Sequence, residues 1–263
     1  MRSNMKLSVV VSLMLAVIFA VALVQLGLVS PDFTSNLYLA YKYLSEIPLQ
    51  GSLLYTGSPE IVTSVLWDQR GIDTYYETTV LFLAIIGTLY IFAEKIKPSE
   101  PSKEMTVIVK LIAKVVAPII MIVSISVALH GHLTPGGGFQ GGSIFVVAPL
   151  ILLAAMGGSK LIKLGFKKDS LLSLRLTGLI LIAFIGISTL IIGFMKGVMG
   201  YLFLNQPKTY VPLGYADVIH APWGEIVIAG TLILLNLMEF LAVSAGFTLA
   251  LLGLDAVVEG GKK

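Results

Sequence analysis

The chain has 263 residues, of which 56% are hydrophobic and only 13% are charged, and it contains no cysteine. This composition excludes an ordinary soluble domain, and the lack of cysteine excludes disulfides and thiolate-held iron–sulfur clusters within the chain. The net charge of +3 comes without a basic stripe of interleaved aromatic residues, so it gives no sign of nucleic-acid binding.

Six apolar stretches are each long enough to cross a hydrocarbon core of about 30 Å, which takes about 20 helical residues. They are too long and too uniformly apolar for barrel strands, which have about ten residues of alternating polarity. We therefore predict an all-α integral membrane protein with six transmembrane helices. The predicted spans are Leu7–Val29, Thr74–Phe92, Val107–Leu129, Phe139–Met156, Leu171–Phe194 and Trp223–Leu252.

The first span follows Arg2 and Lys6, as the apolar region of a signal peptide would. Its apolar region is too long for that, and no small-residue cleavage site follows it, so we expect the segment to be retained as a helix.

Lysine and arginine residues are concentrated in alternate connections between the predicted spans. Under the positive-inside rule this distribution predicts that both termini are cytoplasmic. The inner segments hold Arg2, Lys6, Lys95, Lys97, Lys103, Lys160, Lys163, Lys167, Lys168, Lys262 and Lys263, and the outer segments hold Lys42, Arg70, Lys196 and Lys208.

One charged segment, Glu94–Thr106, contains two prolines and separates a two-helix part from a four-helix part. Such a composition is typical of a solvated connector without a core of its own. We predict a two-helix segment at residues 1–94, a linker at 95–106 and a four-helix domain at 107–263.

Arg70, Asp73 and Glu77 lie on one face of a helix that is expected to begin near Thr74. Acids at a helix N-terminus complement the macrodipole and cap free N–H groups, which explains Asp73 well. Glu77 is already one turn inside the apolar segment, so capping and ion handling stay open as its roles.

Two further charged residues lie deep within predicted spans. Lys114 is about 12 Å inside the third span, and Glu239 is about 20 Å below the outer end of the sixth, at 1.5 Å per residue. Charges at such depth usually face a partner or a wet cavity. One hypothesis is that Lys114 and Glu239 form an ion pair in the cytoplasmic half.

The outer ends of the predicted helices also carry titratable residues. Histidine titrates near neutral pH and carboxylates bind protons or hard cations, so these residue types suit the entrance of a proton or sodium path. The alternative is that they are solvated loop residues. Besides Asp73 and Glu77, the group contains His130, His132, Asp217, His220 and Glu225.

A glycine-rich stretch, HGHLTPGGGFQGG at His130–Gly142, joins the third and fourth spans. Three of its glycines match the G-x-G-x-x-G spacing, but that pattern means dinucleotide binding only within a βαβ unit, so the match is spurious. We expect Thr134 to cap the next helix and Pro135 to open it. The glycines then allow close helix packing, and the free N–H groups can meet an anion or a carboxylate. The residues of this structural motif are Pro135, Gly136, Gly137, Gly138, Gly141 and Gly142.

The stretch from Gly131 to Gly142 resembles the signature of the MrpB (MnhB) subunit of Mrp-type cation/proton antiporters, and the resemblance covers roughly Met105 to the C-terminus. Asp68, Arg70, Gly71, Asp73, Thr74 and Glu77 are similar to the C-terminal end of the large subunit of these antiporters, or to its separate equivalent in membrane-bound hydrogenases. The segment at 94–106 is then a fusion joint. The resemblance implies a multi-pass subunit of the cell membrane that acts in sodium and proton transport, with Glu77 important for ion movement.

The same resemblance implies partners and places the cofactors elsewhere. Partners would be other Mrp-type subunits, either in a free antiporter or attached to hydrogenase-like or iron–sulfur subunits, together with the lipid bilayer, Na⁺ and H⁺. We expect no cofactor, no metal site and no nucleic acid for this chain. A purely structural subunit that holds its neighbours together is the alternative, whereas no nucleophile–base pair or H-E-x-x-H pattern indicates an enzyme.

Overall fold

The structure is a computed structural model that describes residues 2–25, 33–91 and 105–260. The chain folds as two compact units, Met1–Ser45 and Glu46–Lys263. The smaller unit contains α1 (Arg2–Gln25) and α2 (Phe33–Glu46). Most large apolar side chains of α1 between Leu13 and Gln25 are exposed, as in a helix that faces lipid or a partner. The crossing of the membrane by this first helix stays a prediction.

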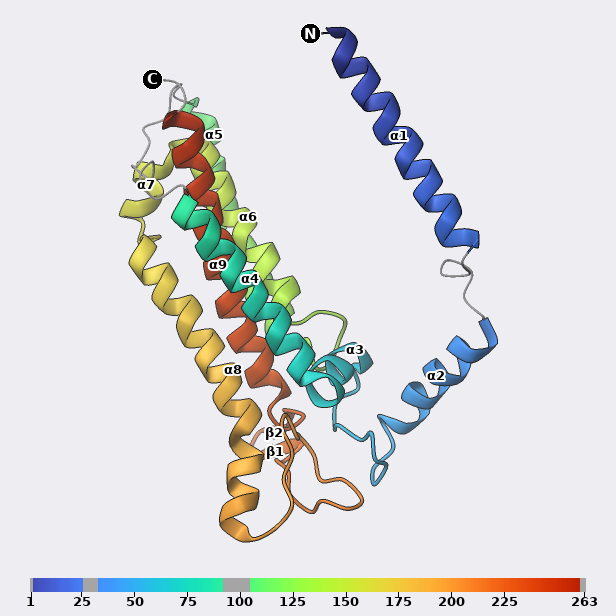
Figure 1. Ribbon diagram of the computed structural model, residues 1–263. Helices are drawn as coiled ribbons and strands as arrows, with labels where there is room; N and C mark the ends of the chain where they lie inside the picture. Colours follow the sequence, from blue (N-terminus) through green and yellow to red (C-terminus); the bar gives the residue numbers. More distant parts are fainter. Residues whose placement is uncertain (1, 26–32, 92–104, 261–263) are drawn as a thin grey trace. The chain divides into compact units, whose positions relative to one another are not determined.

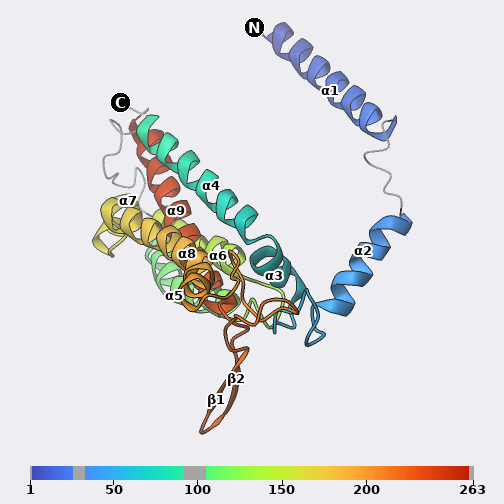
Figure 2. The same ribbon diagram turned by 60° about the horizontal axis from the view of Figure 1, so that its bottom comes forward.

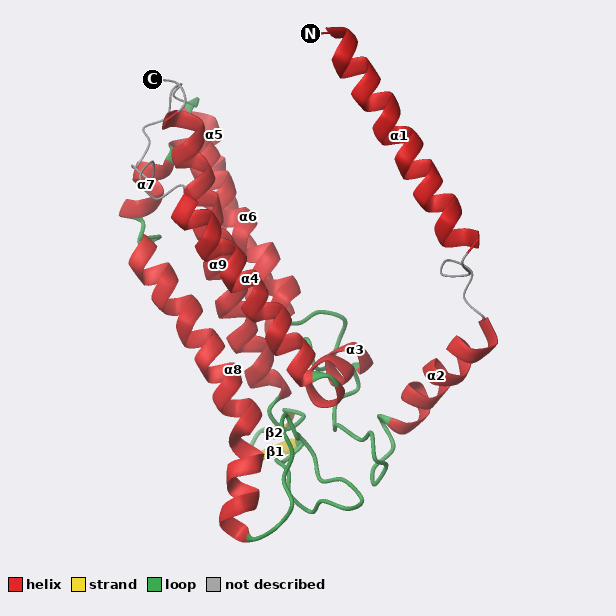
Figure 3. Ribbon diagram, in the orientation of Figure 1, coloured by secondary structure: helices red, strands yellow, loops and turns green. Residues whose placement is uncertain are grey.

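The larger unit contains five helices that are long and apolar enough to cross a membrane. The chain is therefore a multi-pass α-helical membrane protein, as the composition predicts. These helices are α4 (Gly71–Ile91), α5 (Val107–Leu129), α6 (Gly138–Met156), α8 (Lys168–Lys196) and α9 (Leu232–Gly260). Figure 3 shows how fully helices dominate the chain. The predicted linker at 95–106 lies mostly outside the described residues, so that boundary stays a prediction.

Helix α9 is the centre of the bundle (Figure 1). It contacts α4, α5, α6 and α8, and 56% of its apolar window is buried, against 22% for α4 and 22% for α5. Lipid-facing helices keep apolar side chains exposed because the bilayer core is itself apolar. Polar residues on α9 are thus enclosed by protein, and they need partners there.

The two ends of the bundle differ in structure and charge. One end, which we call the hairpin end, contains residues 46–70, 130–137 and 197–231, including α3 (Ile61–Ser64), the π-helical turn η1 (Val65–Gln69) and an antiparallel hairpin. The hairpin strands are β1 (Val218–Ala221) and β2 (Gly224–Val227), and they project from the bundle in Figure 2. The other end, the lysine end, contains α7 (Gly158–Lys163) and the lysines Lys160, Lys163, Lys167 and Lys168. The positive-inside rule predicts that the lysine end is cytoplasmic.

Glycines of the predicted motif lie where α6 approaches its neighbours. A Cβ on Gly141 would lie 2.7 Å from the Ser124 oxygen of α5, and one on Gly142 would lie 2.7 Å from the Val243 Cβ of α9. A Cβ on Gly138 would collide with the backbone oxygen of Asn236. Side chains at these positions would push the helices apart, which accounts for the glycine spacing.

The start of α6 differs from the prediction. Thr134 and Pro135 precede the helix, which begins at Gly138 with Gly137 as its N-cap at φ 141°. Residues 130–134 form a turn of their own, in which the N–H of Thr134 donates to the His130 oxygen at 2.9 Å. The chain can enter the helix only after this turn, through a conformation that favours glycine.

Candidate functional site

The position of Glu239 corrects the depth expected from the sequence. Residues 218–227 form the hairpin, and α9 begins only at Leu232. Glu239 is therefore about 10 Å from the start of its helix, at 1.5 Å per residue. It lies towards the hairpin end of the bundle, not in the predicted cytoplasmic half.

The carboxylate of Glu239 caps the N-terminus of α6. It is buried and accepts a hydrogen bond from the backbone N–H of Phe139 at 3.1 Å. The first N–H groups of a helix lack intrahelical partners, and the helix dipole favours a negative charge there. One free N–H group of the glycine stretch, that of Phe139, thus meets a carboxylate, which comes from another helix.

A cavity of about 500 Å³ lies between η1, α4, α6 and α9, and both Glu77 and Glu239 line it. Most of its wall is apolar, and the polar groups are few. They include the hydroxyls of Thr74 and Thr78 and the side chains of Gln140 and Asn236.

The chemistry of this cavity suits a small hard cation or a proton. Carboxylate, hydroxyl and amide oxygens are the ligands that such cations prefer, and a carboxylate can bind a proton instead. Among the described residues no group of three or more His, Cys, Asp or Glu is placed to hold a metal ion. The cavity therefore brings two carboxylates, Glu77 and Glu239, to one lining.

The Asn236 side chain joins this cavity to the hairpin end. Its oxygen accepts a hydrogen bond from the Trp67 indole N–H at 3.0 Å, whereas its buried amide nitrogen has no hydrogen-bond partner. A buried donor without a partner costs free energy. The Asn236 nitrogen is thus an unsatisfied donor, and it lies close to Gly131 of the turn before α6.

The other two residues predicted to share a face with Glu77, Arg70 before α4 and Asp73 in its first turn, lie outside the cavity lining. Arg70 and Asp73 form an exposed ion pair, in which the Arg70 Nε donates to the Asp73 carboxylate at 2.9 Å. Exposed pairs of this kind contribute little to stability. Glu77 alone of the three lines the cavity.

The two histidines of the glycine stretch have different environments. His130 is exposed, with Nδ1 at 2.9 Å from the Ser126 oxygen. His132 is buried, and its Nε2 lies 2.8 Å from the Val227 oxygen. Burial lowers the pKa of His132 below its ordinary value of 6.5, although the bond to Val227 opposes this. The ring of His132 is thus held by the backbone of the hairpin. The backbone oxygen of His132 is also bound, because it accepts a hydrogen bond from the Ser58 hydroxyl at 2.5 Å.

The predicted ion pair between Lys114 and Glu239 does not form. Lys114 is exposed on α5, whereas the Glu239 carboxylate faces α6 and the cavity. The sequence gives each residue's depth in its helix, but not the direction in which its side chain points. Glu225 lies on the hairpin, where its exposed carboxylate pairs with His220 at 3.1 Å.

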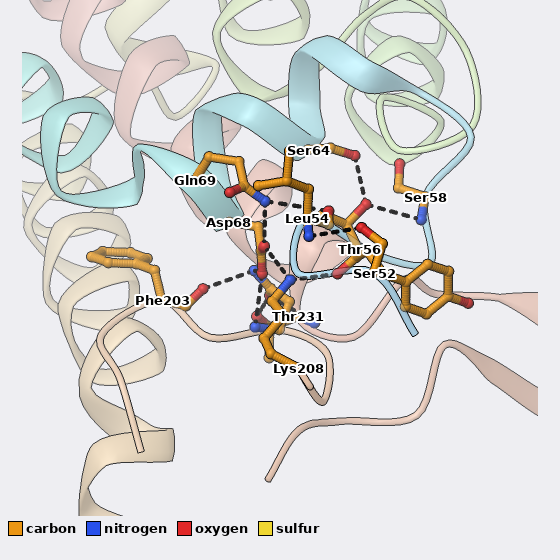
Figure 4. A network of polar contacts seen from close by, with 12 residues as sticks. Ser52, Leu54, Thr56, Ser58, Ser64, Asp68, Gln69, Phe203, Lys208 and Thr231 are labelled. Carbon is orange, nitrogen blue, oxygen red and sulfur yellow. Dashed lines mark hydrogen bonds and ion pairs between the residues drawn. The ribbon is translucent and has the colours of Figure 1, made fainter. Parts of the chain in front are cut away.

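A buried ion pair at the hairpin end was not expected from the sequence (Figure 4). The Asp68 carboxylate accepts hydrogen bonds from the Lys208 ammonium at 2.6 Å and from the Gln69 amide at 2.8 Å. Asn205 adds its backbone N–H at 3.1 Å and its side-chain amide at 3.2 Å. Burial raises the pKa of the Asp68 carboxyl, and Lys208 opposes that rise.

This network links η1 to the loop before the hairpin. Lys208 also donates to the Tyr55 oxygen, and the Tyr55 hydroxyl donates to Asp217 at 2.8 Å. Burial and the neighbouring carboxylate raise the pKa of Tyr55 to about 12. Asp68 and Lys208 are 140 residues apart, and no sequence pattern signals their pairing. Another buried charge that no sequence pattern signals, Arg175, lies inside α8.

Comparisons with known proteins agree with this architecture. Residues 108–249 match the family model described as a domain related to the MnhB subunit of Na⁺/H⁺ antiporters. An uncharacterized protein of Methanocaldococcus jannaschii, MJ1307, is 28% identical over 210 residues, which cover 73% of this chain and 75% of the relative.

Two solved structures share the fold. One is a chain of the membrane-bound sulfane sulfur reductase, an archaeal respiratory membrane complex, with a TM-score of 0.69 and 22% identity over 95% of this chain and 98% of that chain. The other is a chain of the Mrp complex from Dietzia sp. DQ12-45-1b, with a TM-score of 0.65 and 20% identity over 97% of this chain and 26% of that chain.

Proposed function

The chain belongs to the family of domains related to the MnhB subunit of Na⁺/H⁺ antiporters, and we propose that it is a membrane subunit of an Mrp-type cation/proton antiporter module. In this proposal it contributes to cation translocation through the cavity that Glu77 and Glu239 share.

The observation that supports this proposal best is the meeting of two carboxylates at one cavity inside a membrane-spanning bundle. Glu77 is exposed on α4, where a neighbouring protein or water can reach it, whereas Glu239 is buried behind it. Charged groups in a membrane are costly, and they commonly mark ion and proton paths. A cation that enters at Glu77 would find a second carboxylate, Glu239, on the lining of the same cavity.

We also propose that the chain combines two parts that are related to neighbouring subunits. The resemblance of Asp68–Glu77 to the end of the large antiporter subunit supports this idea. One chain of the Mrp complex aligns with 97% of this chain, and therefore with both of its parts, which supports the idea as well. Partners would then be the remaining Mrp-type subunits, in a free antiporter or in a respiratory complex with a redox arm.

The test of the proposed function is the Glu77→Gln variant in the complete complex, purified and placed in sealed vesicles. We expect sodium-dependent proton flux to fall by about 100-fold, the lower range of losses when a group that must carry a proton is removed. Flux is measured from the pH change inside the vesicles after sodium addition. Asp169→Asn is the matched control, because Asp169 is an exposed carboxylate at the lysine end.

A purely structural role predicts a different result. In that case Glu77→Gln would leave the flux per assembled complex unchanged, because the side chain would only help to hold neighbours. Subunit composition by gel and mass spectrometry shows that both variants are compared as complete complexes. Loss of flux in Asp169→Asn as well would also count against a specific role of the cavity.

A further inference from the structure

Arg175 is a completely enclosed charge within the membrane-spanning part of α8. Its relative exposure is 0%, and it lies about 10 Å from the lysine end of its helix, at 1.5 Å per residue from Lys168. Arginine stays protonated in proteins. The guanidinium is thus a positive charge held away from water.

Three helices form the environment of this guanidinium. It donates from Nη1 to the Ala242 oxygen of α9 at 2.9 Å, and its Cζ lies 5.3 Å from the centroid of the Phe82 ring of α4. Gly246 of α9 has no side chain at the place that Nη1 occupies, since a Cβ there would overlap that atom. The guanidinium therefore fills the seam between α4, α8 and α9.

The charge of Arg175 is not neutralised by the described part of the chain. Its Nε and Nη2 are buried without hydrogen-bond partners, and no carboxylate among the described residues pairs with it. The Ala242 carbonyl and the Phe82 ring interact favourably with the guanidinium, but neither carries the negative charge that would neutralise it. A positive potential therefore remains in this seam, and it is strong because the surroundings have a low dielectric constant.

The seam lies beyond the cavity, towards the lysine end of the bundle. Gly246 follows Glu239 by two turns of α9, which places it about 10 Å further along the helix and about 20° around it. Phe82 follows Glu77 on α4 by about 8 Å in the same direction. Because both helices run from the hairpin end to the lysine end, Arg175 lies beyond the two carboxylates on the lysine side.

We propose that Arg175 is an electrostatic barrier that prevents cations in the Glu77–Glu239 cavity from passing through this chain's own bundle to the lysine end. Fixed positive charges exclude cations from pores in this way. Cations that reach Glu239 must then leave through Glu77 or towards a neighbouring protein, so that transport depends on the assembled complex. The inference rests on the proposed function, because it assumes that cations enter the cavity.

The test compares Arg175→Met with Arg175→Lys in the complete complex in sealed vesicles loaded with radioactive sodium. Met keeps an unbranched apolar stem without the charge, whereas Lys keeps the charge. Passive sodium efflux is measured without a proton gradient across the vesicle membrane. We expect it to rise about tenfold or more in Arg175→Met and to stay at the original level in Arg175→Lys. Efflux in the double variant Glu77→Gln with Arg175→Met should return towards the original level if the leak passes through the cavity.

The outcomes separate this inference from the proposed function. Unchanged efflux in an assembled Arg175→Met complex overturns the barrier, even if Glu77→Gln abolishes antiport. Equal leaks in the Met and Lys variants also overturn it, because loosened packing would then explain both. A leak in Arg175→Met that persists with Glu77→Gln contradicts the route through the cavity. If antiport is unaffected by Glu77→Gln alone, the proposed function fails instead.

Discussion

Asp68 and Glu239 are both buried carboxylates towards the hairpin end of the same unit, yet their surroundings differ. Asp68 receives four nitrogen donors from three residues, including the ammonium of Lys208. Within the described residues Glu239 accepts its hydrogen bond from the N–H of Phe139, and it faces a cavity with Glu77 on another wall.

This difference indicates which carboxylate has a role beyond the fold. A buried charge whose lone pairs are all occupied is a structural link, and it has no capacity for a ligand. A carboxylate with one backbone donor keeps lone pairs for a proton or a cation. Burial alone therefore does not identify an ion site, because the number of donors already present must be counted as well.

The largest expected effect on stability comes from breaking the ion pair between Asp68 and Lys208. Lys208→Met leaves the Asp68 carboxylate buried without its counter-ion, and we expect the free energy of unfolding to fall by about 3–5 kcal/mol. Thermal unfolding of the purified complex, followed by intrinsic fluorescence, measures this loss. Complexes of this variant that do assemble should keep their sodium-dependent proton flux.

The control for that change removes both charges. The double variant Asp68→Leu with Lys208→Met replaces the pair by apolar groups, which should recover much of the stability. If Lys208→Met abolished flux in fully assembled complexes, the distinction between a structural and a functional carboxylate would be wrong.

A smaller effect is expected from pH at His132, which is buried in the turn before α6. Because burial lowers the pKa of His132 below 6.5, the folded state favours the neutral ring. The contribution of His132 to the free energy of unfolding is therefore fully present above pH 6.5. It is lost as the pH falls below about 6.5, because His132 binds a proton more tightly in the unfolded chain than in the folded one. The expected loss is about 1.4 kcal/mol for each unit by which the pKa of His132 is lowered.

The measurement is the melting temperature of the complex between pH 7.5 and pH 5.5. His132→Gln should flatten the curve over this range, since glutamine does not titrate. A curve that is equally steep in this variant would place the titrating group elsewhere.

The sequence was sufficient for the spans of the larger unit but not for the arrangement of the site. Hydropathy and length predicted all five helices, because a bilayer requires long apolar segments. The sixth predicted span began at Trp223, yet residues 224–227 are a strand of the hairpin. A short apolar strand directly before an apolar helix has no hydropathy boundary, so the depth of Glu239 was overestimated.

Side-chain direction explains the other differences. The hypothesis of a Lys114–Glu239 pair used depth alone, but contact between helices depends on which faces pack together. The Asp68–Lys208 pair depends on loops far apart in the chain. Arg175 lies only eight residues after Lys167, so in sequence it resembles one more basic residue at a helix end.

In the proposed function, Glu77 and Glu239 each bind the transported cation in competition with protons. The most direct measurement treats the complete complex with a hydrophobic carbodiimide, which modifies protonated carboxyl groups, and locates the modified residues by mass spectrometry. We expect Glu77 and Glu239 to be modified without sodium and protected when sodium is added, whereas Asp68 stays unmodified in both conditions. Modification of Glu77 and Glu239 that does not change with sodium concentration would contradict it.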